Sequence, residues 1–111
     1  MDIVEQRQGA VTVLRPQGPL ALDDAARFKR RAEEALGKSL GRFVIDASSI
    51  PYIDSEGLEV LVDLSELLGQ SGHALKVCGT NETLREVFDL SDVASLFEHY
   101  EDVNTAVRSF L

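Results

Sequence analysis

The stretch that decides the fold is VIDASSIPYIDSEGLEVL, residues 44–61. It begins inside the short apolar run Arg42–Asp46, whose length and β-branched content predict a central strand. A loop with Pro51 follows, and from there leucines and valines recur at helical spacing. The spacing predicts a helix from Asp54 or Ser55 to Leu68. A strand that passes through a short loop into a helix is the repeating unit of α/β proteins.

Working outward, strand and helix periodicities alternate on both sides of this stretch. Before it, Ile3–Gln6 and Ala10–Arg15 flank the turn signal Gln8-Gly9 and predict a hairpin, and an amphipathic helix is expected to end near Gly37. The elements expected after it are a strand at Ala74–Cys78, a short helix capped by Thr80 or Asn81, a strand at Leu96–Tyr100 and a terminal helix carrying Val103, Ala106, Val107 and Phe110. The order ββαβαβαβα predicts an α/β fold, a mixed sheet with an N-terminal antiparallel hairpin and helices packed on it.

The apolar phase of each predicted element also predicts the core. Nine residues are expected to be buried there: Val11, Val13, Phe28, Val44, Ile45, Leu61, Leu64, Val77 and Phe88.

Composition limits the class of protein. The chain has 111 residues, 44% of them hydrophobic, and no linker or repeat divides it, so we expect one domain over residues 1–111. The single cysteine, Cys78, excludes an internal disulfide and favours a reducing compartment. A net charge of -8 disfavours nucleic acid as a partner. The opening residues do not resemble a signal peptide and no apolar run is long enough to insert into a membrane, so we expect a cytoplasmic protein.

The sequence offers no pattern for catalysis, metal or cofactor binding. His73, His99 and Cys78 lack metal-ligand spacing, and phosphate-binding glycine loops and the nucleophile elbow are missing. A phosphate-accepting aspartate at Asp46 is disfavoured, because the acidic pair that would hold Mg²⁺ and the basic residue that would hold a phosphoryl group are not found at the other strand ends. We therefore expect a protein that is not an enzyme, with no catalytic residues, metal or cofactor.

The turn Asp54-Ser55-Glu56-Gly57 is the most informative local feature. Asp54 or Ser55 is a good N-cap, and a phosphate on Ser55 would meet free N–H groups and the positive end of the helix dipole. Gly57 costs about 1 kcal/mol relative to alanine inside a helix, which suggests that something approaches the backbone there. We expect a binding partner to make this close approach. The Gly57→Val variant should then fold normally but obstruct docking of the partner.

At these residues the sequence resembles the STAS domains, and among them the bacterial anti-sigma factor antagonists. Asp46-Ala47-Ser48 matches the family's strand end, and Tyr52-Ile53-Asp54-Ser55-Glu56-Gly57-Leu58 matches its aromatic-x-Asp-Ser-[Ser/Thr]-Gly-[Leu/Ile] turn. The element order fits along nearly the whole chain. The resemblance implies a partner switch, in which the unphosphorylated form binds an anti-sigma factor that is itself a serine kinase and so releases the sigma factor. A PP2C-type phosphatase would reverse the phosphorylation.

Carried over residue by residue, the resemblance implies that Ser55 is the phosphorylation site and that Asp54, Ser55, Glu56 and Gly57 bind the partner. The chain departs from the family in two places. Gly18-Pro19-Leu20-Ala21 lacks the family's acidic pair, for which Asp23 and Asp24 are the candidate substitutes, and Glu56 stands where Ser or Thr is usual. Ser48 and Ser49 are alternative phosphorylation sites. Alternative functions are a STAS subunit of another assembly, such as a signalling scaffold or a lipid-transport complex, and a small-ligand or nucleotide sensor.

Overall fold

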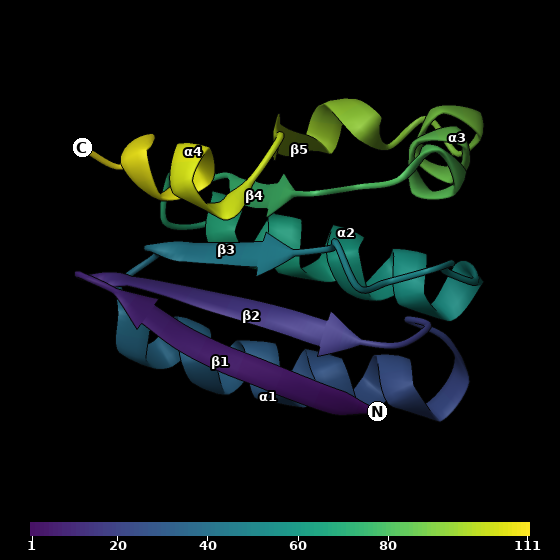
Figure 1. Ribbon diagram of the computed structural model, residues 1–111, viewed down its shortest axis with the longest axis horizontal. Coiled ribbons are helices and arrows are strands. Elements are labelled where there is room, and N and C mark those ends of the chain that lie inside the picture. Colours follow the sequence, from purple (N-terminus) through teal and green to yellow (C-terminus); the bar gives the residue numbers. More distant parts are fainter.

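The computed structural model describes all 111 residues and contains five strands, four α-helices and one 3-10 turn (Figure 1). In chain order the elements are β1 (Asp2–Gln8), β2 (Val11–Gln17), α1 (Leu22–Ser39), β3 (Phe43–Asp46), α2 (Ser55–Gly69), β4 (Leu75–Cys78), α3 (Glu82–Leu90), the 3-10 turn (Ala94–Leu96), β5 (Phe97–Tyr100) and α4 (Val103–Arg108). The predicted order ββαβαβαβα is confirmed, and the 3-10 turn is an addition to it.

The strands form one sheet in the order β1-β2-β3-β4-β5. β1 pairs with β2 antiparallel over its whole length, from Asp2 opposite Gln17 to Gln8 opposite Val11. The other three pairs are parallel, so the predicted mixed sheet with an N-terminal hairpin is confirmed. Because β2 and β3 are parallel neighbours, the loops that follow them leave the same edge of the sheet. These two loops build the candidate site.

Helices cover both faces of the sheet. The larger apolar cluster joins one face to α1, α2 and α3, and α4 covers a smaller cluster of Val11, Val13, Val44 and Cys78 on the other face. In Figure 1, α1 and α2 run alongside the sheet, while α4 and α3 lie toward its opposite ends. All nine residues predicted for the core are buried.

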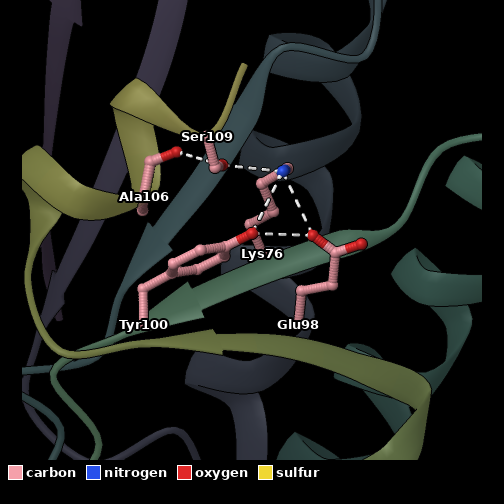
Figure 2. Close-up of polar contacts among 5 residues, drawn as sticks. All are labelled: Lys76, Glu98, Tyr100, Ala106 and Ser109. Atoms are coloured by element: carbon pink, nitrogen blue, oxygen red, sulfur yellow. Dashed lines mark hydrogen bonds and ion pairs between the residues drawn. The ribbon is translucent and has the colours of Figure 1, made fainter. Parts of the chain in front are cut away.

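The short helix α4 is fixed to the sheet by a polar cluster around Lys76 of β4 (Figure 2). The Lys76 ammonium donates to Ser109 Oγ at 2.7 Å and lies 3.1 Å from a Glu98 carboxylate oxygen. It also lies 4.3 Å from the centre of the Phe110 ring, and Tyr100 donates its hydroxyl hydrogen to Glu98 at 2.8 Å. The Lys76 side chain is only 12% exposed, so the ammonium depends on these partners in place of water.

Several element ends differ from the sequence-based expectation by one or two residues. α1 continues two residues beyond Gly37 to Ser39, and the chain leaves it through Leu40 at φ 54° and Gly41 at φ 85°. Gly37 is exposed on the helix and is not its cap. β1 is longer than the predicted Ile3–Gln6, because its pairing with β2 runs from Asp2 to Gln8.

Candidate partner-docking site

Ser55 is the first residue of α2 and is exposed. Asp54 is the N-cap of the helix, with extended backbone at φ -100°, as the sequence pattern predicts. The serine hydroxyl therefore lies at a helix N-terminus that begins at the carboxyl end of β3, after the connecting loop 47–54. Free N–H groups in the first helical turn favour negative charge at this position.

Asp54 uses both carboxylate oxygens to join two parts of the chain. One oxygen accepts from the Gly57 N–H at 2.9 Å, which caps α2, and the other accepts from the Leu22 N–H at 3.0 Å, at the start of α1. These bonds, first that from Gly57, hold the pKa of Asp54 below its ordinary value of 3.8. Asp54 is thus a carboxylate at neutral pH and holds the starts of both helices.

The two loops are also hydrogen-bonded through their backbones. Leu20 and Ile53 form an isolated parallel bridge, in which Leu20 N–H donates to the Tyr52 carbonyl at 3.1 Å and Asp54 N–H donates to the Leu20 carbonyl at 3.4 Å. A further bond joins Gly18 N–H to the Ser49 carbonyl at 3.1 Å. The loop after β2 and the loop after β3 therefore form one continuous surface.

Gly57 is buried, and its role differs from the one expected from the sequence. A Cβ at this position would overlap the Leu20 carbonyl oxygen and lie 2.7 Å from Ile53 Cγ1. The group that approaches the Gly57 backbone is thus the chain's own Leu20. The expectation that Gly57→Val folds normally is wrong, because any side chain here would push the two loops apart. We do not retain Gly57 as a direct contact of a partner.

The other predicted site residues differ in their exposure. Asp23 and Glu56 are exposed in the first turns of α1 and α2, so both add negative charge to this surface. Ser48 is exposed and Ser49 is partly buried. The buried Asp46 carboxylate accepts from the Ser48 N–H at 3.0 Å and orders the start of the loop.

The sequence did not identify Leu22 as a site residue. Leu22 has φ 51°, a left-handed conformation that is rare for leucine, and its side chain is 70% exposed. Tyr52, which is 51% exposed, lines a surface groove together with Leu22, Pro19 and Ala21. No local signal marks Leu22, because its conformation depends on the hydrogen bond to Asp54, 32 residues away.

The cysteine and histidine side chains that could carry other chemistry lie in structural contacts. Cys78 is buried in the small cluster under α4, and burial, with a smaller contribution from Asp46, raises the pKa of its thiol to about 12. A His99 ring nitrogen lies 2.7 Å from the Ala94 carbonyl oxygen. No His, Cys, Asp and Glu side chains are grouped in threes in a way that could hold a metal ion. None of the helices is both long enough and apolar enough to span a membrane.

Comparison with known proteins places the chain in a family. The model of the STAS domain matches residues 2–106. The chain belongs to the STAS domain family. This match confirms the resemblance seen in the sequence.

Relatives of this STAS domain include anti-sigma factor antagonists. BtrV of Bordetella bronchiseptica, assigned to that class, is 28% identical over 94 residues, which make up 85% of this chain and 81% of BtrV. The crystal structure of TM1081 from Thermotoga maritima superposes with a TM-score of 0.88 at 22% identity, covering 96% of this chain and 92% of TM1081. SpoIIAA in its unphosphorylated form gives a TM-score of 0.80 at 14% identity, covering 98% and 96% of the two chains. These two structures share the fold of this chain.

Proposed function

We propose that the protein is an anti-sigma factor antagonist, which binds an anti-sigma factor and thereby releases a sigma factor. The observation that carries the proposal is the position of Ser55, exposed at the start of α2 beside a carboxylate that joins two loops into one surface. The assignment of BtrV to the same class supports it, as does the likeness of the fold to SpoIIAA. The protein acts by binding and carries out no catalysis of its own.

Phosphorylation of Ser55 controls the binding. The anti-sigma factor, acting as a serine kinase, transfers the γ-phosphoryl group of ATP to Ser55 Oγ, with loss of the hydroxyl proton and release of ADP. A PP2C-type phosphatase hydrolyses the phosphoester with water and restores the hydroxyl. The new charge of about -1.5 to -2 lies at a helix N-terminus, where the dipole and free N–H groups favour it, so the domain stays folded.

The same phosphate weakens the complex with the anti-sigma factor. Ser55 lies between Asp54 and Glu56, and Asp23 adds a further carboxylate to the surface. A phosphate adds bulk, bound water and more negative charge where the partner must come close. The unphosphorylated protein binds, and the phosphorylated protein is released.

The test uses purified proteins from the same genome. Each anti-sigma factor with a kinase domain is titrated into the protein by calorimetry, and the binding pair is then incubated with ATP. Peptide mass spectrometry locates the phosphate, and melting and affinity are measured before and after. We expect phosphate on Ser55, a melting temperature within a few degrees of the parent and at least a tenfold loss of affinity. The Ser55→Ala variant should bind the partner and stay unmodified.

Four outcomes would contradict the proposed switch. Phosphate on Ser48 or Ser49 would move the site, and unchanged affinity after modification of Ser55 would exclude release by phosphorylation. Binding without modification by any kinase would favour a constant docking subunit, as in a signalling scaffold or a lipid-transport complex. Tight binding of a nucleotide to the protein alone would favour a ligand sensor.

A further inference from the structure

Two large side chains, Leu22 and Tyr52, lie beside the proposed phosphorylation site and are largely exposed instead of buried in the core. Leu22 is 70% exposed and Tyr52 is 51% exposed, and both line the groove together with Pro19 and Ala21. The groove lies on the surface formed by the two joined loops, because Leu22 donates its N–H to Asp54 and Tyr52 accepts from Leu20 N–H. Side by side, the two give an exposed apolar contact area, and tyrosine is among the residues enriched at the centres of protein interfaces.

The backbone holds Leu22 in this position against its own preference. A leucine at φ 51° is in the left-handed region, where the Cβ atom makes the conformation unfavourable. The hydrogen bond from its N–H to Asp54 at 3.0 Å stabilises the arrangement. Asp54 is the residue next to Ser55, so the orientation of Leu22 is fixed directly beside the modified position.

The surroundings of the patch are acidic. Asp23 and Asp24 line the groove with Leu22 and Arg27. The Asp24 carboxylate pairs with the N-terminal ammonium of Met1 at 3.3 Å, so the exposed Asp23 and Glu56 carry the free negative charge around the patch. The whole chain carries a net charge of -8. A partner that covers the patch must therefore combine an apolar surface with positive charge around it.

Resting on the proposed function, we propose that Leu22 is the apolar anchor of the complex: it inserts, with Tyr52 beside it, into an apolar socket of the anti-sigma factor that is bordered by Lys and Arg side chains. Phosphate on Ser55 then acts on this contact, because the new charge lies one residue from the carboxylate that holds Leu22 in place.

The chain contains a matched control for Leu22. Leu40, at the other end of α1, has φ 54° and is 77% exposed, so it shares the left-handed backbone and the exposure of Leu22 but lies away from Ser55. Glycine adopts positive φ without strain, so Leu22→Gly and Leu40→Gly should both fold, with melting temperatures close to or above that of the parent.

The experiment measures affinity for the purified anti-sigma factor that binds the parent protein, by calorimetry, together with thermal melting of each variant. We expect Leu22→Gly to weaken binding at least tenfold and Leu40→Gly to leave it within twofold. Asp23→Lys should slow association, most clearly at low salt. In the complex, the Leu22 methyl groups should show intermolecular contacts by NMR.

Each contrary result has a distinct meaning. If the parent binds but Leu22→Gly binds as tightly, the anchor is wrong and the proposed function stands. If Asp23→Lys speeds association, the partner's border is not basic and the proposal is overturned. If the parent self-associates in light scattering and Leu22→Gly does not, the patch belongs to a second copy of the chain, which also overturns it. If no anti-sigma factor binds the parent, the proposed function fails and the anchor with it.

Discussion

Two helical glycines, Gly57 and Gly37, have opposite surroundings. Gly57 in α2 faces the Leu20 carbonyl, with no room for a Cβ, whereas a Cβ on Gly37 in α1 would meet no atom within 4 Å. We expect Gly57→Ala to lower the free energy of unfolding by about 1–3 kcal/mol through displacement of the loops. Gly37→Ala should raise it by about 0.5–1 kcal/mol, because alanine favours helix. Urea titration of both variants measures the difference, and equal effects would exclude the close packing at Gly57.

The carboxylate of Asp54 makes part of the stability depend on pH. Its pKa in the folded chain is below the ordinary value of 3.8, so it stabilises the fold fully above about pH 4 and loses this effect as pH falls through the lowered pKa. Asp54→Asn keeps the size of the side chain and one acceptor oxygen, but it removes the charge and the second acceptor that Asp54 offers to the Gly57 and Leu22 N–H groups. We expect the parent to melt at a higher temperature than Asp54→Asn at pH 7, and the gap to narrow below pH 4. A gap that widened in acid would contradict the role of the charge.

At the scale of single elements, α1 depends on the burial of its apolar stripe. Phe28, fully buried against the sheet, is the largest member of that stripe. Truncation by Phe28→Ala should lower the free energy of unfolding by about 3–5 kcal/mol, because it removes apolar burial and leaves a cavity. Lys38→Ala, an exposed change in the same helix, should stay within about 0.5 kcal/mol. If the two variants melted alike by circular dichroism, α1 would not be packed as described.

Most elements could be predicted from periodicity because apolar residues repeat at different intervals in strands and in helices. The α2 cap was also predictable, since Asp54 precedes a regular leucine pattern. The residue at which the chain turns after α1 was not, because glycine is the usual left-handed residue after a helix and the pattern pointed to Gly37, whereas the chain turns at Leu40. Leu22 was missed because leucine also rarely adopts a left-handed backbone conformation. Both leucines adopt a conformation that long-range contacts or neighbouring turns impose, and local preference argues against it.

Part of the candidate site was predictable because it depends on residues that are adjacent in the sequence. Ser55 and Asp54 stand in a local pattern, so the sequence is enough to place them at a helix start. The pattern at Gly57 correctly indicated a close backbone approach, but it could not identify the approaching group. That group is Leu20, 37 residues earlier, brought there by the parallel pairing of β2 and β3.

At the scale of the whole molecule, the Lys76 cluster connects α4 to the sheet (Figure 2). Lys76→Met keeps most of the aliphatic chain but removes the bonds to Ser109 and Glu98 and the contact with Phe110. We expect the free energy of unfolding to fall by about 1–2 kcal/mol. Lys29→Met, which breaks the exposed pair with Asp63, should have a smaller effect. Denaturant titration compares the two, and a larger loss for Lys29→Met would contradict the role of the cluster.

The joining of the two loops determines how Ser55 is presented to any protein that binds or modifies it. Ser55 is presented by a helix cap, a bridge between Leu20 and Ile53, and a carboxylate shared with Leu22. A synthetic peptide that copies residues 49–60 contains none of the 18–22 loop and so lacks most of this arrangement. Under the proposed function, we expect the kinase for Ser55 to recognise a conformational epitope, which a consensus motif built from the linear flanking sequence would not find.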